Sequence, residues 1–123
     1  MNSELEKEIV SKFIAPNRKD RFLWNLGSPK RRNKIFDDLR DTRHFKEGLC
    51  NEVDGPEEVL KHLGVNSGEI YVISSETKYD GKQVDLRELE KIEFWEAEEI
   101  IGYDSKSKKG FFVNHESWFF TIG

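Results

Sequence analysis

Two runs of consecutive apolar residues near the end of the chain place the strongest constraint on its fold. They are Phe111-Phe112-Val113 and Trp118-Phe119-Phe120. Successive side chains of a strand point to opposite faces of a sheet, so each run puts large apolar groups on both faces. A strand with one solvated face would instead alternate apolar and polar residues. A sheet built from these strands therefore needs cover on both faces.

The sequence leaves two sources for that cover. Helices within residues 4–40 can cover one face, and a short helix near residues 85–92 is one candidate for the other. The second candidate is a protein–protein contact, because an uncovered aromatic patch on the order of several hundred Å² is unusual on a monomer. An interface of this kind, with a protein partner or within a homo-oligomer, would include Phe111, Phe112, Trp118, Phe119 and Phe120.

Helix-start signals recur in the first half of the chain. Ser3 followed by Glu6 is a capping-box pattern, and Ser28-Pro29 combines an N-cap with a proline at the first helical position. The predicted helices cover residues 4–14, 17–27, 29–40, 55–64 and 85–92. Residues 41–54 are predicted to form a loop with a short extended piece near Leu49.

Strand patterns dominate the second half. In residues 69–74, Ile70 and Val72 fall on one face, and Tyr71 and Ile73 fall on the other. Further strands are predicted over residues 98–103, 110–113 and 118–122. The predicted fold class is α+β, with N-terminal helices packed on a small, mostly antiparallel sheet that ends in a C-terminal hairpin. Residues 1–123 are expected to form a single domain, with a helical half (1–64) and a sheet half (65–123).

The net charge of −4 conceals an asymmetry along the chain. Residues 12–46 hold eleven Lys/Arg and four Asp, a balance of +7, whereas residues 47–104 hold five Lys/Arg and sixteen Asp/Glu, a balance of −11. Such an asymmetry can mark a surface for nucleic acid or for an acidic partner. The alternative is that the basic helices dock on the acidic half and are neutralised internally.

The basic cluster at residues 29–34 separates into an outward and an inward part. At about 100° per residue, Ile35, Phe36 and Leu39 define the apolar face of a helix, with Arg32 at its centre. Lys30 and Lys34 point to the opposite side. We expect Arg32 to be buried against a carboxylate, as a structural bridge, or against a bound phosphate or carboxylate ligand, as an anion site.

Trp24 points away from the apolar face of its predicted helix. An exposed Trp beside Arg21 would be a good anchor for a protein partner, and packing against the first helix is the alternative. The full set of candidates for binding an anion or a partner is Arg18, Arg21, Trp24, Lys30, Arg31, Arg32 and His44.

Signals for catalysis are weak, so an enzyme is the minority interpretation. The three histidines are far apart in the sequence, and His44 is the one to test as an acid or base. Cys50 is the single cysteine, which excludes an intrachain disulfide and a cysteine-based zinc site and fits a reducing cytoplasm. Glu96, Glu98 and Glu99 are interpreted as surface charges. No cofactor, metal or membrane span is predicted.

Several short motifs resemble those of a set of short bacterial proteins of unknown function. The resemblance is carried by Phe13, Pro16, Arg18, Arg21, Pro29-Lys30-Arg31-Arg32, Lys34, His44, a Val-Ile-Ser strand and Asp80-Gly81. It implies one compact bacterial domain with a Pro-Lys-Arg-Arg helix start, and it implies no activity.

Three functions remain open. The first is a small cytoplasmic protein-binding module, such as an inhibitor, immunity or anti-defence protein that acts by binding rather than by catalysis. The second is a nucleic-acid-binding module that uses the basic residues 12–46. The third is a small-anion or nucleotide-binding protein centred on Arg32.

Overall fold

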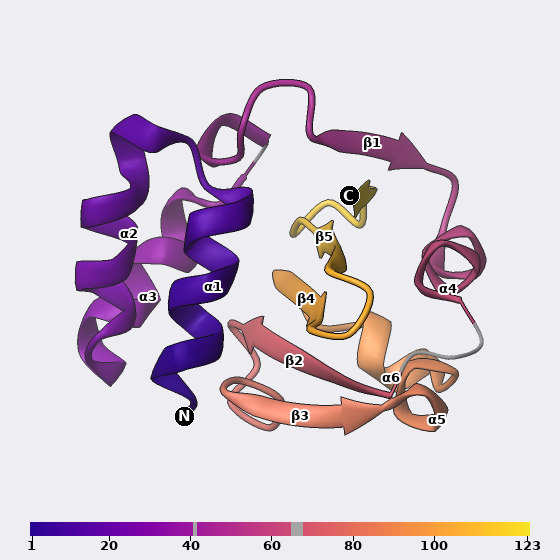
Figure 1. Cartoon of the computed structure of the whole chain (residues 1–123). Coiled ribbons are helices and arrows are strands. Elements are labelled where there is room, and N and C mark those ends of the chain that lie inside the picture. The colour runs from indigo at the N-terminus through magenta and orange to yellow at the C-terminus, as the bar shows by residue number, and fades with distance from the viewer. Residues whose placement is uncertain (41, 65–67) are drawn as a thin grey trace.

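The computed structural model has one six-stranded sheet with helices on both sides (Figure 1). It describes residues 1–40, 42–64 and 68–123. The helices are α1 (Ser3–Phe13), α2 (Lys19–Leu26), α3 (Pro29–Asp38), α4 (Pro56–Leu63), α5 (Leu86–Leu89) and α6 (Ile92–Trp95). Two short 3-10 helices are η1 (Pro16–Arg18) and η2 (Thr42–His44). None of the helices within the described ranges has the length and apolar character that a membrane span needs.

The strands are β1 (Cys50–Val53), β2 (Glu69–Ser74), β3 (Lys82–Asp85), β4 (Ile100–Asp104), β5 (Lys109–Val113) and β6 (Phe119–Ile122). They lie in the order β1-β6-β5-β4-β2-β3, and every neighbouring pair is antiparallel. The predicted α+β class and the C-terminal hairpin, formed by β5 and β6, are confirmed.

The first and third helices begin with side-chain caps, which satisfy backbone N–H groups that have no partner within the helix. Asn2, rather than the predicted Ser3, caps α1, and its Oδ1 accepts a hydrogen bond from the Leu5 amide at 3.1 Å. Ser28 caps α3 as predicted, with its Oγ accepting from the Arg31 amide at 3.3 Å. The caps therefore set where α1 and α3 start.

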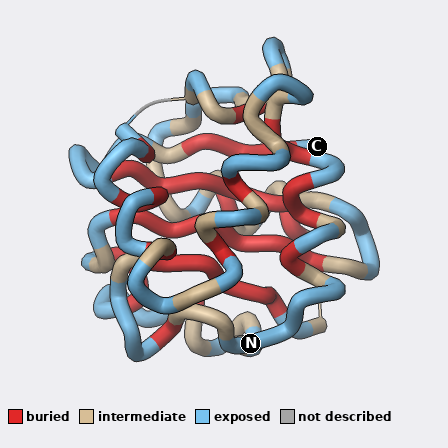
Figure 2. Tube along the Cα trace, turned by 90° about the vertical axis from the view of Figure 1, so that its left-hand side faces the viewer, coloured by how far each residue is buried: buried red, intermediate tan, exposed pale blue. Residues whose placement is uncertain are grey.

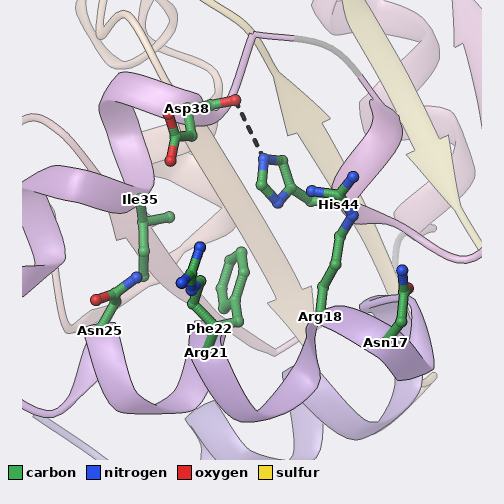
Figure 3. Close-up of a pocket in the computed structure, with 8 residues that line it drawn as sticks. All are labelled: Asn17, Arg18, Arg21, Phe22, Asn25, Ile35, Asp38 and His44. Carbon is green, nitrogen blue, oxygen red and sulfur yellow. Dashed lines mark hydrogen bonds between the residues drawn. The ribbon is translucent and has the colours of Figure 1, made fainter.

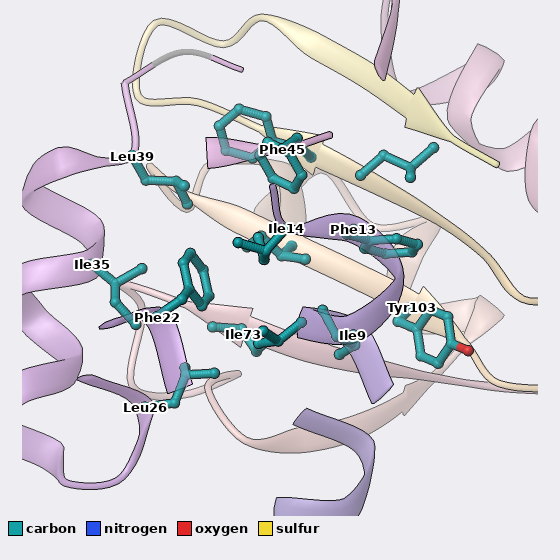
Figure 4. Close-up of a cluster of buried hydrophobic side chains, with 14 of the residues drawn as sticks. Ile9, Phe13, Ile14, Phe22, Leu26, Ile35, Leu39, Phe45, Ile73 and Tyr103 are labelled. Atoms are coloured by element: carbon teal, nitrogen blue, oxygen red, sulfur yellow. The ribbon is translucent and has the colours of Figure 1, made fainter. Parts of the chain in front are cut away.

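Alternate strand residues belong to two separate cores, one on each face of the sheet. Tyr71 and Ile73 join the core that α1, α2 and α3 cover. Figure 4 shows Ile73 within this core. Ile70 and Val72 join the core on the side of α4, α5 and α6. The buried residues run through the strands, while the outer helices and turns carry most of the exposed ones (Figure 2). The predicted alternation of residues 69–74 therefore holds.

The aromatic runs of the C-terminal strands are covered by the chain itself. Phe111 and Phe112 are fully buried, and Phe120 is 8% exposed. Phe119 packs against the core of α4–α6, with its ring 6.0 Å from that of Trp95. The burial of Phe111, Phe112 and Phe120 contradicts their predicted place in a protein interface, because α1–α3 cover one face of the sheet and α4–α6 cover the other. Of the five candidates, Trp118 is the one that remains largely exposed to solvent, at 49%.

The division into a helical half and a sheet half is also corrected. β1 lies within the predicted loop 41–54, yet it pairs with β6 at one edge of the sheet. Asp41, the first residue of that predicted loop, lies outside the described residues. β3, which was not predicted, forms the other edge by pairing with β2. Both edge strands are short and largely polar, so their sequences lack the apolar alternation that reveals a strand.

Glu99, just before β4, is buried with 8% of its surface exposed, so its prediction as a surface charge is wrong. Burial raises the pKa of its carboxyl, because the charged form loses contact with water. A carboxyl whose pKa is higher in the folded than in the unfolded state destabilises the fold at any pH above both values. That penalty disappears as the pH falls below the pKa that the carboxyl has in the unfolded state.

We therefore expect Glu99→Gln to increase the free energy of unfolding at pH 7, with the gain shrinking as the pH falls toward about 4. Urea denaturation of both proteins at several pH values measures this difference. Glu98→Gln, at the exposed neighbouring position, is the matched control and should change stability little. Equal stability of wild type and Glu99→Gln at pH 7 would contradict the assignment.

Candidate functional site

The exposed side of α2 carries polar and aromatic side chains. Phe22 and Leu26 are buried, with 4% and 5% exposure, and they hold the opposite side of the helix against the core. At about 100° per residue, Trp24 falls on the far side of the helix, and Arg21 and Asn25 lie between the two sides. The burial of two residues thus determines which side chains α2 presents to solvent.

A pocket with a volume of about 270 Å³ lies between α2 and α3. Its lining comes from η1 and α2 (Asn17, Arg18, Arg21, Phe22, Asn25), from α3 (Ile35, Asp38) and from η2 (His44). Figure 3 shows Arg18 and Arg21 rising from the same stretch of helix toward the side that holds His44 and Asp38. The structure thus brings together three of the predicted site residues: Arg18, Arg21 and His44.

The two arginines of the pocket carry uncompensated charge. Neither guanidinium forms an ion pair with any residue in the described part of the chain. The acid that lines the pocket is Asp38, and its backbone carbonyl accepts a hydrogen bond from Nε2 of His44 at 3.2 Å. The His44 ring also stands edge-on to Phe22, with centroids 6.3 Å apart. His44 is therefore oriented by α3 and by Phe22.

Trp24 and Arg31 form a second feature at the C-terminal end of α2. Trp24 is 64% exposed, so the alternative that it packs against the first helix is wrong. The guanidinium of Arg31 lies 4.0 Å from the centre of the indole ring, in a cation–π arrangement. Its Nε also donates to the Trp24 carbonyl at 2.9 Å, which fixes the arginine in place. Arg31, rather than Arg21, is the arginine beside this tryptophan.

Arg32 is buried against carboxylates, as the sequence predicted. It is 2% exposed, and its Nε and Nη2 donate to the two carboxylate oxygens of Asp80 at 2.8 and 2.7 Å. Its Nη1 donates to Glu6 at 3.0 Å and to the Leu26 carbonyl at 3.1 Å. The Tyr71 hydroxyl completes this network by donating to Glu6 at 2.7 Å. This is the structural bridge, and the alternative of an anion site centred on Arg32 is wrong.

The acidic half of the chain pairs with some of the basic residues of α3 and not with others. Arg32 bridges to Asp80, but Lys30 and Lys34 are exposed and pair with no acid among the residues that the structure describes. On the other face of the sheet, α4–α6 and their flanks carry exposed acids that include Glu57 and Glu93. The exposed lysines of α3 and these exposed acids therefore lie on opposite sides of the sheet.

Cys50 and His62 could in principle take part in catalysis, but the surroundings of each favour a structural role. Burial raises the pKa of the Cys50 thiol to about 12, so the thiol stays protonated and unreactive at neutral pH. His62 in α4 contacts the Ile122 carbonyl through Nε2 at 2.8 Å, which ties α4 to β6. Across the described ranges, no group of three or more His, Cys, Asp or Glu side chains could hold a metal ion.

Five of the pocket residues were not predicted as site residues: Asn17, Phe22, Asn25, Ile35 and Asp38. Helical spacing alone could have added Asn25, which lies four residues after Arg21 and so on the same side of α2. The contribution of α3 depends on how the two helices pack, which no local pattern reveals. Searches against protein families, curated proteins and solved structures found no match for this chain.

Proposed function

We propose that this chain acts by binding another protein, through a contact surface formed by Trp24, Lys30 and Arg31. The observation that carries the proposal is Trp24, which is 64% exposed and is held in position by Arg31. Trp and Arg are the residues most enriched at the energetic centre of interfaces. A side chain that is already ordered also loses less entropy on binding.

The partner we propose is an acidic surface or segment of a protein. Lys30 and Arg31 pair with no acid in the described ranges, so a carboxylate from a partner would meet cations without a competing acid. A long polyanion such as DNA would be repelled by the net charge of −4, to which the acidic helices on the other side of the sheet contribute. These charges favour a compact partner, in keeping with a small inhibitor, immunity or anti-defence protein.

The proposal predicts that Trp24→Ala weakens capture of the partner by at least about tenfold, because truncating a central Trp costs roughly 2 kcal/mol or more. The immobilised chain is used to capture proteins from a lysate, the captured protein is identified and purified, and its affinity for each variant is measured. The melting temperature should change little, since Trp24 is 64% exposed and the substitution removes only its contact with Arg31 from the side-chain interactions described above.

Trp118→Ala is the matched control, because Trp118 is also exposed, at 49%, and lies on the turn before β6. It should bind the partner like the wild type. Loss of binding with Trp118→Ala and not with Trp24→Ala would move the contact to the C-terminal sheet and overturn the proposed surface. Capture of nucleic acid in place of a protein, with affinity that falls steeply as salt rises, would favour the nucleic-acid alternative instead.

A further inference from the structure

The pocket between α2 and α3 is lined by positively charged side chains and by apolar side chains. Arg18 and Arg21 contribute two positive charges and Asp38 contributes one negative charge, which leaves an excess of one positive charge among these three side chains. Phe22 and Ile35 line the same pocket, and each is only 4% exposed. A ligand that matches this lining carries one negative charge and a small apolar body.

We propose that this pocket is a binding site for a carboxylate carried on a small apolar or aromatic body. A guanidinium can donate two parallel hydrogen bonds to a carboxylate, and Arg18 and Arg21 have no competing acceptor of this kind in the described residues. The pocket volume of about 270 Å³ lies just below the range of about 300–1,000 Å³ found for drug-sized ligands. It therefore suits a single ring or one amino-acid side chain.

Asp38 argues for a carboxylate over a phosphate monoester. A phosphate monoester carries about −1.5 to −2 charges at pH 7 and would meet the repulsion of the Asp38 carboxylate at close range. A carboxylate has one charge, which equals the excess on the three side chains. Phe22 and Ile35 would then contact the apolar body of the ligand rather than a second anionic oxygen.

The test titrates the isotope-labelled protein with benzoate and follows its NMR spectrum. We expect saturable shifts at the Nε–H groups of Arg18 and Arg21, and much weaker binding of benzamide, which has the same shape without the charge. Arg18→Gln and Arg21→Gln should each weaken benzoate binding by about tenfold or more, as the loss of one charge-assisted hydrogen bond implies. Lys30→Gln, an equal charge change outside the pocket lining, should change the affinity less than twofold.

Asp38→Asn adds a second, independent measurement. This variant removes the negative charge of Asp38 from the described lining, so phenyl phosphate should gain affinity relative to benzoate. All these positions lie at the surface or the pocket rim, and an unchanged melting temperature verifies that each variant is folded.

A blocked peptide, acetyl-Ala-Glu-Ala-amide, distinguishes the two sources of a carboxylate. Binding of benzoate alone supports the site with a free small acid as its ligand, and binding of the peptide supports it with an acidic side chain of a partner. Shifts from neither probe, equal shifts from benzamide, or wild-type affinity in both Arg→Gln variants would overturn the inference. Trp24→Ala should leave benzoate binding unchanged. The proposal of a carboxylate site and the proposal of a protein contact at Trp24 are therefore tested independently.

Discussion

Replacing Arg32 by alanine is expected to lower the free energy of unfolding by about 3–5 kcal/mol. The substitution leaves the carboxylates of Glu6 and Asp80, which are 7% and 11% exposed in their side chains, without their cation. It also removes the link between α3, α1 and the turn after β2, because Asp80 accepts from the Ser74 amide as well. Small domains are stable by only about 5–15 kcal/mol in total, so much of the stability would be lost. Urea denaturation followed by circular dichroism measures the change.

Two further variants make this expectation specific. Arg32→Lys keeps the positive charge but cannot form the two-pronged contact with Asp80, so its stability should fall between those of wild type and Arg32→Ala. Lys34→Ala, an exposed position two residues along α3, should change stability by no more than about 0.5 kcal/mol. Identical denaturation midpoints for Arg32→Ala and Lys34→Ala would show that the buried network contributes nothing to stability.

The second large effect is expected at Gly110 in β5, where the chain has no room for a side chain. A Cβ atom there would lie 2.5 Å from the Gly102 carbonyl oxygen of β4 and 2.6 Å from the ring of Phe13. The carbonyl belongs to the paired neighbouring strand, so it cannot move without disturbing the ladder. We expect Gly110→Ala to destabilise the protein by about 1–3 kcal/mol, the usual cost of forcing an extra group into a packed core.

Gly55→Ala provides the control for this substitution. Nothing lies within 4 Å of a Cβ built at Gly55, and its backbone is extended, so alanine fits there without strain. Its midpoint of denaturation should stay within about 0.5 kcal/mol of wild type. Equal effects of the two substitutions would mean that the close approach of β4, β5 and α1 is not a tight contact.

Local patterns in the sequence were sufficient for most of the fold. The capping signals and the apolar spacing of residues 35–39 predicted α3 and the inward position of Arg32, because these effects act within one or two turns of helix. The alternation of residues 69–74 predicted which side chains face each core, since the period of a strand is two. The consecutive aromatics of the last strands predicted a sheet that must be covered on both faces.

Tertiary packing decided the features that matter for function. Glu6 and Asp80, the partners of Arg32, lie 26 and 48 residues away in the chain, and only the packing of α1 and β2 around α3 selects them from many acids. The burial of Phe111 under α4–α6, and of Phe112 in the core that α1–α3 cover, is also a long-range effect. The pocket of Arg18, Arg21 and His44 exists because η2 returns to α2 and α3. Contacts of this kind depend on the relative placement of whole elements, and residue spacing along one element carries no information about it.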